Sequence, residues 1–219
     1  MSIIYLSNVT LSFPHLIEPQ VTVTDDGNKR SSYNVDLIME PNHPSYATFM
    51  KRWSEIALEK WKENAQAVMQ MIHANRKQRC YGPGEEVINK KTFKPYDGYV
   101  DMVHIGAGCD KPPQMILPDG SKADTSNTML YQQLARELYA GCRVNVAIKP
   151  WPQDNKKGGL GIRSDLVAIQ FASKGTPFGE APVDVTGIFG QVTNSEVQQS
   201  STAAMPGVPS FTSVPSFLG

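Results

Sequence analysis

The chain has 219 residues, of which 40% are hydrophobic and 19% charged, and its 21 basic and 21 acidic side chains give a formal net charge of zero. This composition excludes a disordered or fibrous chain, and the apolar stretches are too short to cross a bilayer. Residues 1–13 have neither the basic start nor the long apolar run of a secretory signal, so we expect a cytosolic protein.

The zero net charge hides an uneven distribution. Residues 181–219 contain Asp184 and Glu196 but no Lys or Arg, so this segment carries −2 and residues 1–180 carry +2. Residues 143–174 hold six basic side chains against two acidic ones. A local basic excess of this kind is compatible with binding to phosphate backbones.

Strands are expected at the start of the chain. Residues 3–13 are rich in strand-forming side chains and end at Phe13–Pro14, and a short strand is expected at residues 21–24. Residues 25–28, Asp-Asp-Gly-Asn, are a hairpin turn signal. Residues 33–39 then alternate as the next strand.

The hydrophobic period changes to that of a helix over residues 44–78. Aromatic and aliphatic side chains recur there every three or four positions, with charged side chains between them. Pro44 suits the first helical position, and a break near Asn64 favours two helices over one. We expect Trp53 and Trp61 to belong to the core.

The rest of the chain predicts further strands and one short helix. Residues 99–107 indicate a strand, residues 129–139 a short helix, and residues 143–149 a half-exposed strand. Residues 158–161, Gly-Gly-Leu-Gly, turn the chain into a last strand at residues 162–172.

These elements predict a mainly β domain over residues 1–180, a five-stranded OB-fold barrel with a helical insertion at about residues 44–79. After Gly179 the composition shifts, because 18 of the 39 residues from Ala181 are Pro, Gly, Ser or Thr. That bias is typical of a disordered segment, so we expect a flexible Pro/Ser/Gly-rich tail at 181–219.

No motif in the chain indicates catalysis or a bound cofactor. The three cysteines and four histidines share no metal-ligand spacing, and neither a phosphate-binding loop nor a nucleophile motif is present. We therefore expect a protein that is not an enzyme and that holds no metal or cofactor. The alternative is a metal-dependent nuclease, in which Asp97 and Asp101, four residues apart on a strand, share one face.

Several short stretches resemble a known family, and they occur in order from residue 8 to residue 179. They are Asn8–Pro19, Tyr96–Tyr99 with the strand to Ile105, Lys111–Pro112, Leu138–Val146, Pro150–Trp151 with Asp154–Asn155, Gly161–Gln170, Gly175 and Phe178–Gly179. The set resembles a family of bacteriophage single-stranded DNA-binding proteins and is similar in architecture to the T7-type phage replication proteins. The resemblance implies an OB-fold, sequence-tolerant binding of single-stranded DNA, and a role in phage replication or recombination in the cytoplasm of the infected bacterium.

The tail departs from the T7-type pattern, in which an acidic C-terminal tail ends in an aromatic residue and recruits replication partners. Here the tail has two acids and ends Phe217-Leu218-Gly219. Docking of replication proteins on the repeated Pro-Ser-Phe motif and assembly into a homo-oligomer remain hypotheses, and a phage structural or assembly protein is the other alternative.

Single-strand binding needs cations along the phosphates and exposed aromatic faces on which bases stack. Trp151 follows a half-exposed strand and precedes a basic hairpin turn, where a loop of an OB-fold reaches DNA. Phe93 and Tyr99 have a structural alternative, in which they fill the barrel. The candidate DNA-binding residues are Lys29, Arg30 and Tyr33; Lys90, Lys91, Phe93, Lys94, Tyr96 and Tyr99; Lys111; and Arg143, Lys149, Trp151, Lys156, Lys157 and Arg163.

Overall fold

The computed structural model describes residues 2–23, 27–124, 126–156 and 158–179. The chain divides into two units, Met1–Ala181 and Pro182–Gly219, and the description below concerns the first. The tail expected at residues 181–219 lies outside the described residues, as does Lys157.

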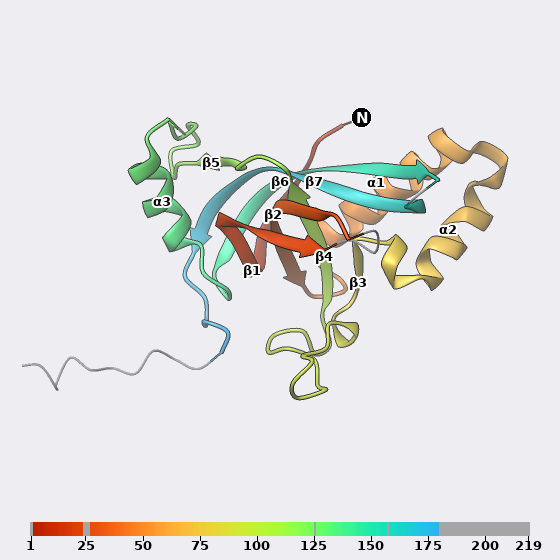
Figure 1. Cartoon of the computed structure of the whole chain (residues 1–219), viewed down its shortest axis with the longest axis horizontal. Coiled ribbons are helices and arrows are strands. Elements are labelled where there is room, and N and C mark those ends of the chain that lie inside the picture. Colours follow the sequence, from red (N-terminus) through yellow and green to blue (C-terminus); the bar gives the residue numbers. More distant parts are fainter. Residues whose placement is uncertain (1, 24–26, 125, 157, 180–219) are drawn as a thin grey trace, which may run out of the picture. The chain divides into compact units, whose positions relative to one another are not determined.

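Five strands close into a barrel (Figure 1): β1 (Ile4–Val23), β2 (Lys29–Met39), β4 (Val103–Cys109), β6 (Arg143–Asn155) and β7 (Gly159–Ser173). β1 pairs antiparallel with both β2 and β6, while β2 pairs with β4 and β6 pairs with β7. The barrel closes where Gly108 of β4 pairs in parallel with Asp165 of β7. The structure thus confirms the predicted five-stranded barrel with a helical insertion.

Several strands differ from their predicted bounds. β1 is continuous where a loop was expected after Phe13, because register shifts between Ser12 and His15 and between His15 and Gln20 let it stay paired with β2. β4 begins at Val103, four residues later than predicted, since Met102 N donates to the Tyr99 carbonyl in a turn, 3.2 Å.

Two short strands were not predicted. β3 (Tyr81–Pro83) pairs with β4, and β5 (Gln114–Ile116) pairs in parallel with β7. Each has three residues, too few to show a hydrophobic period, so only the neighbouring strand defines it.

The helical insertion consists of α1 (Pro44–Trp61) and α2 (Ala65–Ala74), separated by a 3-10 turn at Lys62–Asn64, as the pattern predicted. The His43 side chain caps α1 by accepting from Ser45 N. Trp53 lies in the core, where its indole N–H donates to the Tyr81 hydroxyl at 2.7 Å. A third helix, α3 (Thr128–Glu137), lies between β5 and β6 in the chain.

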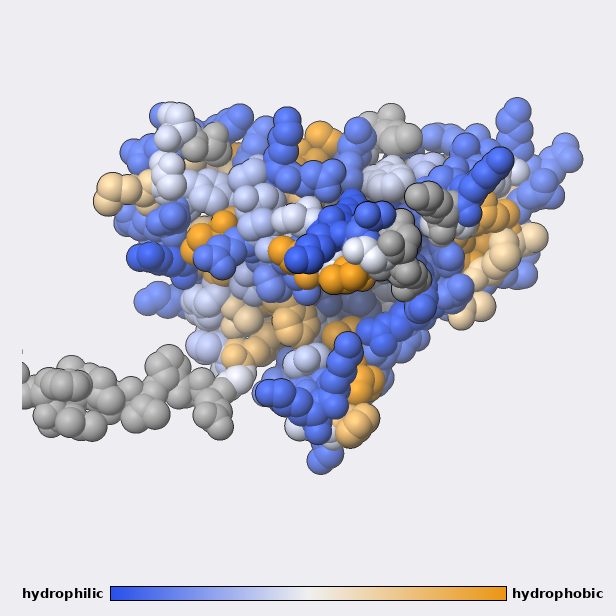
Figure 2. Space-filling view, in the orientation of Figure 1, coloured by the Kyte–Doolittle hydropathy of each residue, from blue (hydrophilic) through white to orange (hydrophobic). Residues whose placement is uncertain are grey.

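The barrel interior forms the main core, and alternate side chains of β6 such as Val144, Val146 and Ile148 are completely buried in it. The loop between β3 and β4, drawn in yellow-green below the barrel in Figure 1, has a mostly hydrophilic surface in Figure 2. None of the helices in the described part of the chain combines the length and the hydrophobicity that a membrane span requires.

Candidate nucleic-acid interface

A groove of about 770 Å³ crosses one face of the barrel. The β1–β2 hairpin supplies one wall and the β6–β7 hairpin supplies the other, with residues 106–109 of β4 between them. In OB-folds, oligonucleotides bind on the face of the second and third barrel strands, between the loops that join strands one to two and four to five. The groove occupies the same place here.

The groove is hollow where two glycines of β4 line it. Gly106 and Gly108 face it, alternating with the buried Ile105 and Ala107. A Cβ added at Gly106 would be in ordinary contact with the Cys80 carbonyl oxygen at 3.6 Å and with an Asp36 carboxylate oxygen at 3.8 Å, so a methyl group fits there without a clash. Strand glycines of this kind allow a ligand to approach the backbone closely.

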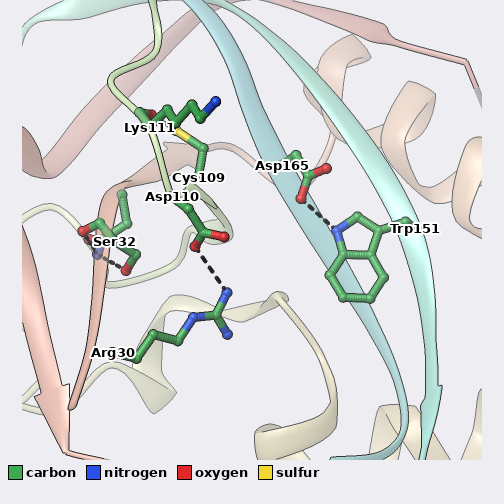
Figure 3. Close-up of polar contacts among 8 residues, drawn as sticks. Arg30, Ser32, Cys109, Asp110, Lys111, Trp151 and Asp165 are labelled. Atoms are coloured by element: carbon green, nitrogen blue, oxygen red, sulfur yellow. Dashed lines mark hydrogen bonds and ion pairs between the residues drawn. The ribbon is translucent and has the colours of Figure 1, made fainter.

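The β2 wall carries polar side chains in a regular row. Arg30, Ser32, Asn34 and Asp36 line the groove at alternate positions, as the pleat of a strand requires. The Arg30 guanidinium lies 3.5 Å from an Asp110 carboxylate oxygen (Figure 3). Both side chains are largely exposed, so this pair holds Arg30 only weakly and leaves it available to a phosphate.

The opposite wall is built around Trp151, which faces Arg30 across the hollow in Figure 3. The indole N–H donates to an Asp165 carboxylate oxygen at 2.7 Å, which orients the ring. Arg163, the cross-strand partner of Trp151, donates to the Gln153 side chain at 3.1 Å and to the Lys77 carbonyl at 2.8 Å. Burial lowers the pKa of the Arg163 guanidinium below its ordinary, very high value.

Phe13 and Tyr96 form one end of the groove. Their rings meet edge to face with centroids 4.9 Å apart, and Phe13 has a positive φ of 44°. Sequence reasoning missed Phe13 as a site residue, although the Phe13–Pro14 break in the strand pattern was a visible signal. A non-glycine residue held at positive φ is uncommon and often marks a functional position.

A buried polar network lies behind this end of the groove. The Tyr99 hydroxyl donates to one Asp36 carboxylate oxygen at 2.6 Å, and His104 Nδ1 lies 2.9 Å from the other. Burial and then the Asp36 charge raise the pKa of the Tyr99 hydroxyl, so it stays a donor. The carboxylates of Asp36 and Asp165 therefore both point at protein donors.

The groove brings together Arg30, Tyr96, Trp151 and Arg163 from the residues predicted by sequence. Four further predicted cations lie on the hairpins or beside them without lining the groove. Lys29 and Lys156 are exposed at the hairpin ends, Lys149 is half-buried opposite Asp165, and Lys111 is exposed beyond β4.

Three predicted residues lie elsewhere. Tyr99 follows the structural alternative, because it is completely buried and offers no face to a base. Tyr33 alternates with the groove-lining residues of β2 and so takes the other face. Arg143 is eight residues from Trp151 along β6, roughly 26 Å at the rise of a strand, and contacts the Asn8 carbonyl instead.

The remaining predicted residues belong to the loop between β3 and β4. Phe93 is 82% exposed, and Lys90, Lys91 and Lys94 are exposed beside it. None of the four lines the groove itself.

The arrangement expected for a nuclease is not met. Asp97 and Asp101 precede β4, in turns, so no strand places them on one face. Within the described ranges, no group of three or more His, Cys, Asp or Glu side chains is placed to hold a metal ion.

The chain matches, over residues 2–197, the family model described as the single-stranded DNA-binding protein of Enterobacter phage Enc34. A protein designated p50 from Acyrthosiphon pisum secondary endosymbiont phage 1 is 27% identical over 178 residues, which is 80% of this chain and 85% of p50.

Solved structures to which this one is similar include the following two. The bacteriophage Enc34 single-stranded DNA-binding protein in complex with single-stranded DNA has 22% identity and a TM-score of 0.58, over 81% of this chain and 89% of that one. The gp2.5 single-stranded DNA-binding protein of bacteriophage T7 has 12% identity and a TM-score of 0.48, over 93% of this chain and 99% of that one. At 22% identity, the Enc34 likeness is one of fold.

Proposed function

This chain belongs to the family described for the single-stranded DNA-binding protein of Enterobacter phage Enc34, and we propose that it binds single-stranded DNA in the groove between its two hairpins. The observation that carries the proposal is the groove, which has aromatic and cationic side chains from both hairpins and lies where OB-folds bind oligonucleotides. Membership of the family over residues 2–197 supports the same assignment.

Bases stack on the aromatic side chains of the groove. Trp151 supplies a large ring on one wall, and the Phe13–Tyr96 pair supplies the end. Each stacked base contributes roughly 1–3 kcal/mol, and every base has a π-face, so binding tolerates any sequence.

Phosphates run along the rims. Arg30 and Lys156 are exposed there and can neutralise the backbone without being buried. Asp36 and Asp165, on the two walls, would repel phosphates but not bases. The charge pattern therefore favours a strand whose bases point inward and whose phosphates face solvent.

The wider role is part of the proposal. We infer that the protein acts without catalysis in replication or recombination of phage DNA, in the cytoplasm of the infected bacterium. Recruitment of replication proteins through the tail and assembly into a homo-oligomer are proposed with it, although the tail lies outside the described residues.

One binding experiment tests the function against its alternatives. A labelled oligothymidine is mixed with the protein at low salt, with and without magnesium, and resolved on a native and a denaturing gel. We expect a shift at micromolar protein or below and no cleavage. The absence of a shift would favour a structural or assembly protein, whereas cleavage that needs magnesium and both Asp97 and Asp101 would favour the nuclease.

A further inference from the structure

A second hollow, of about 440 Å³, adjoins the groove at its aromatic end. Phe13, His15 and Tyr96 line both hollows, so the two are separated by no more than these side chains. The second hollow is hereafter called the side pocket. A DNA strand that leaves the groove past Phe13 and Tyr96 would enter the side pocket directly.

The far wall of the side pocket is Phe178, held in place by close packing. Its backbone N–H donates to the Ala140 carbonyl at 3.0 Å, and its ring lies over Gly98. A Cβ at Gly98 would come within 2.4 Å of a Phe178 ring atom, and Gly98 has a φ of +80°. Glycine at this position thus lets the ring form the wall.

The chemistry of the side pocket suits a nucleobase better than a phosphate. Phe13, Tyr96 and Phe178 offer aromatic surfaces, while Asn89 and Asp97 offer polar groups at the rim. The Asp97 carboxylate can accept from the N–H groups of a base and would repel a phosphate. Aromatic surfaces with a few polar groups are typical of small-ligand sites.

Unpaired cations lie next to the side pocket, in the loop that supplies Asn89 and Tyr96. Backbone bonds from Asn89 N to the Lys94 carbonyl, 2.9 Å, and from Phe93 N to the Asn89 carbonyl, 2.8 Å, close this loop into a tight turn. The turn exposes Lys90, Lys91 and Lys94, none of which forms an ion pair with another described residue.

We propose, on the basis of the proposed function, that bound single-stranded DNA continues past the Phe13–Tyr96 pair and places one nucleobase in the side pocket, with the adjoining phosphates at Lys90, Lys91 and Lys94. The proposal gives a role to the turn that carries Lys90, Lys91 and Lys94, which do not line the groove. It also makes the DNA site longer than the groove.

A filled side pocket tests the proposal. Ala140 lines the side pocket but not the groove, so Ala140→Phe should block the base and leave the groove intact. Ala172→Phe is the matched control, because it adds the same ring at an exposed position that lines neither hollow. Both variants are compared with the wild-type protein over a series of oligothymidines of increasing length, by fluorescence anisotropy.

We expect Ala140→Phe to bind the shortest effective oligothymidine like wild type. Longer oligothymidines should bind to Ala140→Phe roughly 5- to 150-fold more weakly than to the wild-type protein, which is the range for the loss of one stacked base. Equal affinities of Ala140→Phe and Ala172→Phe for every length would overturn the inference. If the wild-type protein binds no oligothymidine of any length, the proposed function itself fails, and the two failures are distinguishable.

A surface variant keeps the test independent of core packing. Replacing Lys90, Lys91 and Lys94 together by alanine should lower affinity for long oligothymidines more than for the shortest one. The control removes three exposed lysines that line neither hollow: Lys51, Lys62 and Lys122. An equal effect of both triple variants on long oligothymidines would contradict the proposed path, even if Ala140→Phe did not fold.

Discussion

Replacing Trp151 by alanine should weaken the binding of single-stranded DNA without unfolding the barrel. The side chain is half-buried and lines the groove, so its removal costs the ligand a stacking surface and costs the core little. One stacked base is worth roughly 1–3 kcal/mol, and about 1.4 kcal/mol corresponds to a tenfold change in affinity. We therefore expect a loss of roughly 5- to 150-fold.

Because Trp151 also donates a hydrogen bond to Asp165, we expect the loss of DNA affinity in Trp151→Ala to lie in the upper part of that range. Without the indole N–H, 2.7 Å from its oxygen, the Asp165 carboxylate loses its donor and faces the groove as an uncompensated charge. Trp151→Phe keeps an aromatic ring but also loses this donor. Its affinity should lie between those of the wild-type protein and Trp151→Ala.

The assay is fluorescence anisotropy of a labelled oligothymidine at one fixed salt concentration, because affinities at different salt concentrations are not comparable. Tyr5→Ala is the matched control, since Tyr5 is 60% exposed and lines neither hollow. Thermal midpoints of all variants are measured in parallel. If Trp151→Ala binds as tightly as Tyr5→Ala, stacking on this wall is refuted.

Further predictions concern the groove floor, salt and the core. Gly106→Ala should lower DNA affinity by up to about tenfold, no more than the loss of roughly one stacked base, with a nearly unchanged thermal midpoint, because a Cβ there meets nothing closer than 3.6 Å. With about five phosphates neutralised, the slope of log affinity against log salt should be near −3.5, and a flat plot would contradict phosphate contacts. Trp53→Phe, which loses the 2.7 Å bond to Tyr81, should lower the free energy of unfolding in urea by about 1–3 kcal/mol while DNA affinity stays constant.

The helical insertion could be predicted in detail because its signals are local. The hydrophobic period over residues 44–78 and the proline at its start predicted α1 and α2. A break near Asn64 was predicted as well, and the structure has it at Lys62–Asn64. The strands of the barrel were predicted in kind but not in extent. β1 stays continuous across Phe13–Pro14 only because β2 continues to pair with it, which no local pattern reveals.

Part of the candidate site was also predictable. A tryptophan between a half-exposed strand and a basic hairpin turn pointed to Trp151, and Arg163 was grouped with the basic residues around it. The sequence did not tell Arg30 from Tyr33, whereas the alternation of β2, which begins at Lys29, puts Arg30 and not Tyr33 on the groove face.

The sequence by itself determined that the domain is mainly β, where its helices lie, and which hairpin carries the tryptophan. The tertiary structure alone decided which aromatic residues meet. Phe13 and Tyr96 are far apart in the chain yet touch at the groove end, while Tyr99, three residues after Tyr96, is sealed behind them. The reason is physical: the exposure of a ring near a barrel depends on which strands pack around it, and Tyr99 contacts Phe13 of β1, Asp36 of β2 and His104 of β4, which no local pattern connects.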